Sequence, residues 1–195
     1  MIAGLVLAAG RSARFGGDKL LASLRGHAVL YWSARALEAG GVDALYVVVP
    51  SEGAARVAAL EGTPCVVVEH AGRDAGMATS IGAGIAALPT SVDAVVIALA
   101  DQPGVGADVV RRLCARWHEG GVAAVAPRYR DGRGHPVLFG RATFAALTAL
   151  TGDGGAREVL DALGDGLAHV PVGGPMPQDV DTPDELRALE GAWRA

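Results

Sequence analysis

Residues 5–21 read LVLAAGRSARFGGDKLL and change abruptly from an apolar run to a segment of glycines and basic side chains. The apolar run extends back to Ile2, so it predicts a buried strand ending near Ala8. A flexible, glycine-rich segment directly after a buried strand is typical of the loop that joins a strand to a helix in an α/β sheet. This stretch therefore indicates an α/β fold with a ligand-binding loop near its start.

The same alternation continues through the first half of the chain. Short runs that are apolar on both faces predict parallel strands at residues 2–8, 44–49, 65–68 and 94–99. Apolar residues at three- and four-residue spacing predict helices at residues 29–39, 54–61 and 80–88. Repeated strand–helix units of this kind favour a right-handed, doubly wound sheet.

The second half is less regular, but it shows no repeat, linker or break in composition. Helices are predicted at residues 108–117, 141–150, 156–163 and 183–192, the last with Thr182 or Asp181 as its N-cap. Strands are predicted at residues 122–127, 135–139 and 169–172. We expect one domain, residues 1–195, with a three-layer Rossmann-like fold: a mostly parallel sheet with helices on both faces.

Composition excludes several classes of protein. The net charge is −4 and the basic residues are scattered, which argues against nucleic acid as a partner. Mean hydropathy is +0.32, but every apolar run ends well before the roughly 18 residues of a membrane span. We expect no membrane partner and a cytoplasmic protein. The two cysteines, Cys65 and Cys114, lie in apolar segments and predict free thiols.

The glycine-rich loop matches neither common phosphate-binding pattern, because it has no Gly-Lys-Ser/Thr ending and no GxGxxG. Its glycine N–H groups and the cations Arg11, Arg14 and Lys19 nevertheless suit a polyphosphate. A loop with solvated charges would have the same composition, so the residues alone leave both interpretations open.

Two acidic segments offer ligands for Mg²⁺. Asp101 follows the apolar run at residues 94–99, and a carboxylate at the tip of a buried parallel strand lies in the ligand crevice. Asp179 and Asp181 come much later, before the last predicted helix. Carboxylates from distant segments can converge on Mg²⁺, which shares its ligands with substrate phosphates. A turn at Asp101, helix capping by Asp181 and solvation of Asp179 are the structural alternatives.

Taken together, these segments resemble the MobA-like nucleotidyltransferases, in particular those that act on molybdenum cofactor. LAAGRSARFGGDKLL is similar to their LAAGxSxRxGxxK signature, GMATSIGAGI (76–85) to a second nucleotide-contacting loop, and ALADQP (98–103) to a metal-binding segment. RGHPVLFGR (133–141), TGDGGAR (151–157) and DVDTPDEL (179–186) also match. The resemblance implies a fold like the GT-A nucleotide-diphospho-sugar transferases.

The resemblance also implies a function for individual residues. Lys19, Arg14 and Asp101 would be catalytic, and Asp101 with Asp181 would bind Mg²⁺, although Asp179 competes for the second position. Arg133 and His135 would contact the acceptor; an exposed loop arginine and a loop-bonding histidine are the alternatives. The nucleotide would be bound by Leu7, Ala8, Ala9, Gly10, Arg11, Ser12, Gly76, Met77 and Ser80.

The implied reaction transfers CMP from CTP to the terminal phosphate of molybdopterin cofactor and releases pyrophosphate. Leu-Ala-Ala-Gly at the start favours the cytidylyl branch, because the guanylyl branch typically has Leu-Ala-Gly-Gly. The cytidylyl branch implies a molybdenum hydroxylase as the client enzyme. The alternatives are a guanylyltransferase, a MobA-like enzyme with another acceptor, and a non-catalytic module that inserts the cofactor. A nicotinamide-dependent oxidoreductase is a weaker rival, because the dinucleotide fingerprint is absent.

Overall fold

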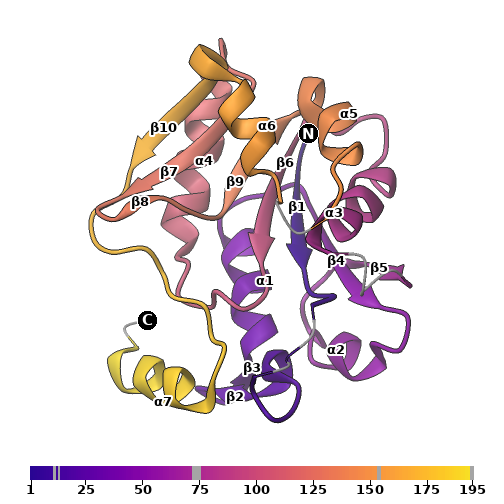
Figure 1. Ribbon diagram of the computed structural model, residues 1–195, viewed down its shortest axis with the longest axis vertical. Helices are drawn as coiled ribbons and strands as arrows, with labels where there is room; N and C mark the ends of the chain where they lie inside the picture. The colour runs from indigo at the N-terminus through magenta and orange to yellow at the C-terminus, as the bar shows by residue number, and fades with distance from the viewer. Residues whose placement is uncertain (11, 13, 72–75, 153–154, 194–195) are drawn as a thin grey trace.

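The apolar runs form the centre of an eight-stranded sheet in a computed structural model that describes residues 1–10, 12, 14–71, 76–152 and 155–193 (Figure 1). The short strand β8 (Gly132–Arg133) pairs with β7 at one side of the sheet. The other strands follow the order β10 (Leu167–Pro171), β7 (Ala124–Tyr129), β9 (Val137–Gly140), β6 (Ala94–Leu99), β1 (Ile2–Leu7), β4 (Ala44–Pro50) and β5 (Val66–His70).

The strand directions confirm a mostly parallel sheet, with the short strand β8 antiparallel to β7 and one reversal within the main strand order. β6, β1, β4 and β5 run parallel, and β10 is parallel to β7. β9 runs antiparallel to both of its neighbours, β6 and β7. The sequence pattern did not predict this reversal, because an apolar run identifies a buried strand without giving its direction.

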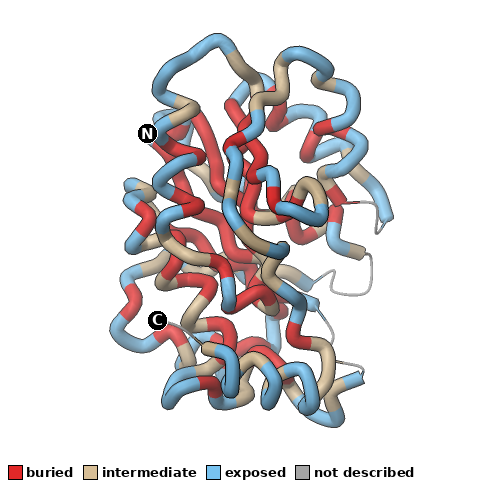
Figure 2. Tube along the Cα trace, turned by 90° about the vertical axis from the view of Figure 1, so that its left-hand side faces the viewer, coloured by how far each residue is buried: buried red, intermediate tan, exposed pale blue. Residues whose placement is uncertain are grey.

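Helices cover both faces of the sheet and form the outer layers of the predicted three-layer fold (Figure 1). Val6 of β1 belongs to the core cluster that contains residues of α1 (Val29–Ala39) and α4 (Ala107–His118). Its neighbour Leu5 belongs to the opposite cluster, with residues of α3 (Met77–Ala86), α5 (Phe144–Thr148) and α6 (Arg157–Ala162). Successive residues of a strand point to opposite faces, so each apolar strand supports two cores. Figure 2 shows buried backbone running through the centre of the molecule and exposed segments at its periphery.

Several boundaries differ from the sequence-based expectation. α2 (Ala54–Ala58) ends earlier than predicted, α3 begins three residues earlier, and residues 141–150 divide into η2 (Arg141–Thr143) and α5. The hairpin of β2 (Ser23–Leu24) and β3 (His27–Ala28) was not predicted, because two-residue strands are too short to show a period. The remaining elements are η1 (Lys19–Leu21), η3 (Gly164–Gly166) and α7 (Pro183–Ala192).

The parallel strands bring their carboxyl ends to one edge of the sheet. In Figure 1 the arrows of β1 and β6 point towards the end of the molecule where the β2–β3 hairpin and α7 lie. Loops after these strands therefore meet at that edge, which is where α/β sheets bind ligands. No helix in the described part of the chain has the length and apolar character needed to span a bilayer.

The packing of α3 on β1 generates a stability prediction. A Cβ added at Gly84 would lie 2.5 Å from Leu5 Cδ2, whereas a Cβ added at Gly82 would lie 3.9 Å from its nearest neighbour, the Thr148 carbonyl oxygen. We expect Gly84→Ala to lower the free energy of unfolding by about 1–3 kcal/mol through overpacking. Gly82→Ala, the matched control on the same helix, should raise it by up to about 1 kcal/mol. Urea unfolding of both variants tests the packing, and equal effects would contradict it.

Candidate active site

The glycine-rich loop and the Asp101 segment leave the sheet side by side. Leu7 ends β1 and pairs in register with Leu99, which ends β6. The Ala100 N–H donates to the Leu7 carbonyl over 3.2 Å, extending the contact by one residue beyond the strands. Asp101 follows immediately, so its carboxylate emerges next to the start of the loop.

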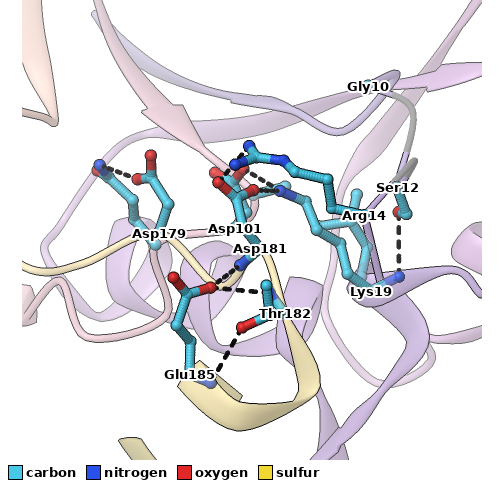
Figure 3. A network of polar contacts seen from close by, with 12 residues as sticks. Gly10, Ser12, Arg14, Lys19, Asp101, Asp179, Asp181, Thr182 and Glu185 are labelled. Atoms are coloured by element: carbon cyan, nitrogen blue, oxygen red, sulfur yellow. Dashed lines mark hydrogen bonds and ion pairs between the residues drawn. The ribbon is translucent and has the colours of Figure 1, made fainter. Parts of the chain in front are cut away.

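Lys19, at the other end of the loop, joins two carboxylates that are distant in the sequence. Its Nζ lies 2.7 Å from Asp101 Oδ2 and 2.6 Å from Asp181 Oδ1 (Figure 3). Arg14 Nη2 lies 2.6 Å from the second oxygen of Asp181. Lys19 is 9% exposed, whereas the Arg14 side chain is largely in solvent. The geometry thus brings four predicted site residues into one ion network.

The electrostatics favour the charged forms of Lys19 and Asp181. Burial lowers the pKa of Lys19, but its hydrogen bonds and charge interactions with Asp101 and Asp181 outweigh burial and raise the pKa above its ordinary value. The hydrogen bond from Lys19 is the largest cause that lowers the pKa of Asp181. Lys19 is also the only lysine in the sequence. A compact ammonium can serve two carboxylates at once and can reorient towards phosphate oxygens.

Asp179 occupies a different environment from Asp181. Its Oδ1 accepts a 2.7 Å hydrogen bond from Gln102 Nε2, and its side chain points away from the Lys19 network (Figure 3). Burial is the main cause that raises its pKa, and the negative charges of Asp101 and Asp181 add to the increase. Of the two candidates for the second metal ligand, Asp181 is the one that shares a cation with Asp101.

The start of α7 explains how Asp181 is held. Thr182 is the N-cap: its Oγ1 accepts from the Glu185 N–H over 3.3 Å, and Glu185 Oε2 accepts from the N–H groups of Asp181 and Thr182 at 2.8 Å each. The capping box therefore fixes the backbone of Asp181 and leaves its carboxylate free to bind cations. The Val180 N–H donates to the Asp101 carbonyl over 2.8 Å, which ties the two acidic segments together.

Lys19 is positioned by Ser12, predicted above only as a nucleotide-binding residue, and by Asp18 and Arg56, which were not predicted as site residues. Ser12 Oγ accepts from the Lys19 N–H over 3.0 Å, so this side chain folds back on the loop. Asp18 caps η1 by accepting from the Leu20 N–H over 3.1 Å. Asp18 in turn pairs with Arg56. The sequence gives one indication of Arg56, which is that a single basic residue stands within an apolar helical segment.

The predicted nucleotide-binding residues lie along the same edge. Ala8 and Ala9 are buried, whereas Gly10 is exposed and a Cβ there would meet no atom within 4 Å. Arg11 lies outside the described residues. The second loop reaches this edge because α3 follows the parallel strand β5. There Gly76 has φ +88°, Met77 is exposed, and Ser80 is buried one turn into the helix.

The two candidate acceptor residues have different surroundings. Arg133 Nη2 pairs with Asp161 on α6 over 2.8 Å, so its guanidinium is directed towards that helix. His135 is half-buried, and burial lowers its pKa in spite of the nearby charges of Asp179 and Asp101. Within the described residues, His135 Nδ1 has no hydrogen-bond partner.

The carboxylates of Asp101 and Asp181 fit a divalent cation, because both approach the same ammonium. No group of three or more His, Cys, Asp or Glu side chains suited to a metal exists among the described residues. An ion held by two carboxylates would take its other ligands from water and phosphate oxygens, as Mg²⁺ commonly does. The donor set therefore suits a metal that arrives with a phosphate-bearing substrate.

A doubly wound sheet with a glycine-rich loop, a lysine and paired carboxylates at its carboxyl edge defines a nucleotidyltransferase-type site. Residues 4–168 match the family described as "MobA-like NTP transferase domain", and the chain belongs to that family.

Similar proteins match most of the chain in sequence, and solved structures match almost all of it in fold. Nicotine blue oxidoreductase of Paenarthrobacter nicotinovorans is 31% identical, over 82% of this chain and 81% of its own. A crystal structure of Rv0371c from Mycobacterium tuberculosis superposes with a TM-score of 0.84 at 34% sequence identity, covering 97% of both chains. The manganese complex of Rv0371c superposes with a TM-score of 0.82 at 32% sequence identity, covering 98% of this chain and 99% of the other. A nucleotidyl transferase from Methanothermobacter has a TM-score of 0.81 at 25% identity, covering 98% and 97%.

Removing the ammonium should expose the metal site. We expect Lys19→Met to bind Mn²⁺ about tenfold or more tightly than the wild type without nucleotide, because the ion no longer competes with Nζ for Asp101 and Asp181. Electron paramagnetic resonance of free Mn²⁺ measures the affinity. Arg35→Met, which removes a surface cation paired with Glu38, is the control and should not change it. Equal affinities for Lys19→Met and the wild type would contradict a metal site at these carboxylates.

A second prediction concerns the segment before β9. The Tyr129 hydroxyl donates to the His135 carbonyl over 2.9 Å, and burial raises the Tyr129 pKa from 10.0 to about 12. Tyr129→Phe should lower the free energy of unfolding by about 1 kcal/mol at neutral pH. Because the folded state keeps the phenol proton longer, the stabilising contribution is complete below the unfolded pKa and is lost as the pH rises towards the folded one.

Urea unfolding at neutral pH and at about pH 11 tests this, since the difference between the wild type and Tyr129→Phe should shrink at the higher pH. Tyr31→Phe controls for loss of a phenol on α1. A difference between the wild type and Tyr129→Phe that is constant with pH would contradict the raised pKa of Tyr129.

Proposed function

We propose that this MobA-like nucleotidyltransferase transfers CMP from CTP to the terminal phosphate of molybdopterin cofactor and releases pyrophosphate. The observation that carries the proposal is the position of Lys19, whose ammonium bridges Asp101 and Asp181 beside the glycine-rich loop. The segments that resemble the molybdenum cofactor enzymes include all three residues of this bridge.

The chemistry explains why the network contains no general base. In the proposed reaction an acceptor phosphate oxygen forms a bond to the α-phosphorus of the nucleotide while the bond to the β-phosphate oxygen breaks. That acceptor oxygen is already anionic at neutral pH, so catalysis depends on alignment and charge neutralisation. Lys19 and Arg14 would leave the carboxylates and neutralise the charge on the α-phosphate and the pyrophosphate. Mg²⁺ held by Asp101 and Asp181 would supply further charge neutralisation.

The backbone of the loop would bind the nucleotide. We assign Leu7, Ala8, Ala9 and Gly10 to the base and ribose, and the open space at Gly10 supports a close approach. Arg11 would add charge on the phosphate side. Ser12 would act mainly within the loop, because its hydroxyl is engaged by the Lys19 N–H. Gly76, Met77 and Ser80 would complete this pocket.

The acceptor would lie on the other side of Asp101. His135 supports this position, because its ring is close enough to Asp101 and Asp179 to interact electrostatically with both. Arg133 is weaker as a ligand, since it would first have to leave Asp161. A molybdenum hydroxylase remains the expected client for a cytidylylated cofactor.

One relative's name, nicotine blue oxidoreductase, favours a second candidate, a redox reaction. The Lys19 bridge argues for phosphoryl chemistry, because a hydride-transfer site needs no paired metal carboxylates. A thermal-shift comparison separates the two: CTP with Mg²⁺ should stabilise the protein and NAD(P)H should not. The opposite result would favour the oxidoreductase.

Loss of the metal carboxylate should abolish most of the activity while leaving the fold intact. We expect Asp101→Asn to reduce kcat for pyrophosphate release by about 10²–10³-fold, the usual effect of removing one electrostatic catalytic group. Circular dichroism should show an unchanged fold. Asp165→Asn on η3, a carboxylate outside the network, is the control and should retain activity. Full turnover by Asp101→Asn would exclude the proposed metal site.

Base and acceptor are tested with the wild type, Mg²⁺, molybdopterin cofactor and each of CTP, GTP, ATP and UTP. Pyrophosphate release with CTP alone supports the cytidylyltransferase. Release with GTP moves the protein to the guanylyl branch, and no release with any nucleotide indicates another acceptor or a non-catalytic insertion module.

A further inference from the structure

Arg56 of α2 is a buried arginine whose guanidinium contacts the glycine-rich loop at three places. It is 3% exposed. Its Nε lies 2.7 Å from Asp18 Oδ2, its Nη2 donates to the Gly10 carbonyl over 3.1 Å, and its Nη1 donates to the Ala8 carbonyl. Each guanidinium nitrogen thus serves a different oxygen of the same loop.

These oxygens belong to the two ends of the loop. Ala8 and Gly10 follow β1 directly, whereas Asp18 is the residue before Lys19. A glycine-rich segment has many conformations to lose when it becomes ordered. A single buried guanidinium that binds both ends restricts the loop before any ligand arrives, which lowers the entropic cost of ligand binding.

The contacts also set the direction of a backbone donor. In a trans peptide the carbonyl of one residue and the N–H of the next point in opposite directions. Since the Ala8 carbonyl faces Arg56, the Ala9 N–H faces away from it. Backbone N–H groups directed out of a loop of this kind bind phosphate and other anions.

Asp18 extends the influence of Arg56 to Lys19. One carboxylate oxygen of Asp18 binds Arg56, and the other accepts from the Leu20 N–H at the start of η1. Lys19 lies between Asp18 and Leu20, and its side chain crosses to Asp101. Arg56 therefore supports both the loop backbone and the backbone from which the Lys19 side chain extends.

We propose that Arg56 is a positioning residue that holds the two described ends of the glycine-rich loop, residues 8–10 and 18–19, in the conformation that binds the triphosphate, without touching the nucleotide itself. This inference rests on the proposed nucleotidyl transfer. Burial separates Arg56 from solvent, so its charge acts on the loop oxygens and not on a ligand directly. If Arg56 were purely structural, substituting it would lower only the stability of the protein. If Arg56 is a positioning residue, substituting it lowers nucleotide affinity in protein that remains folded.

The test uses Arg56→Lys, which keeps the charge but cannot bind three oxygens in a planar arrangement. We expect the affinity for Mg²⁺–CTP, measured by isothermal titration calorimetry, to fall about tenfold or more, since charge-assisted hydrogen bonds are lost. Backbone amide exchange of Lys19 and Leu20 should become faster, while the amides of β6 are unaffected. Arg141→Lys is the control, because its guanidinium binds the Pro89 carbonyl outside the loop.

A second variant, Asp18→Asn, covers the case in which Arg56→Lys does not fold. It keeps the shape of the side chain and weakens the ion pair to Arg56, so it should change affinity and exchange in the same direction by a smaller factor. Wild-type affinity and wild-type exchange in a folded variant would overturn the inference. If the wild type itself binds no nucleotide triphosphate, the proposed function fails, and the exchange of Lys19 and Leu20 still decides whether Arg56 orders the loop.

Discussion

The site depends on one interaction, the ammonium of Lys19 between the carboxylates of Asp101 and Asp181. Three distant segments must meet for it to form, and parallel strands make that possible because their carboxyl ends share an edge. A buried ammonium is costly without partners, and two carboxylates offset the cost. The capping box at Thr182 and the strand pairing of Leu7 with Leu99 can both be understood as structures that hold these groups at hydrogen-bonding distance.

The two positive charges of the network, on Lys19 and Arg14, balance the two negative charges of Asp101 and Asp181. Such a network is suited to exchanging its ion pairs for others. Lys19 and Arg14 are paired with carboxylates that would otherwise repel each other. In the proposed reaction, the negative charge of a triphosphate would attract the two cations, and a divalent ion would take their place at the carboxylates. Binding of a metal–nucleotide complex would therefore replace one set of ion pairs with another and leave little charge unpaired. Arg56 stays outside this exchange, because the loop occupies its guanidinium.

The sequence predicted the parts of this arrangement that depend on local pattern. Buried strands appear as apolar runs, and Asp101 and Lys19 appear as charged residues at the ends of such segments. Arg56 could not be predicted, because one basic residue in a short helix gives no indication of which loop it faces. The bond between Gln102 and Asp179 is likewise a consequence of tertiary packing, and no spacing in the sequence encodes it. The direction of β9 could not be predicted either, because it also depends on tertiary packing. Strand direction nevertheless determines at which edge of the sheet the adjoining segments lie.

The reversal of β9 has a direct consequence for the site. Val137 near its start pairs with Ile97 near the end of β6, so the residues before β9 arrive at the carboxyl edge of the sheet. A parallel strand in this position would begin at the opposite edge and would carry His135 away from Asp101. The antiparallel direction instead places His135 within electrostatic reach of Asp101 and Asp179. One strand reversal thus brings His135 to the edge of the sheet that carries Asp101, which is where the acceptor would bind in the proposed reaction.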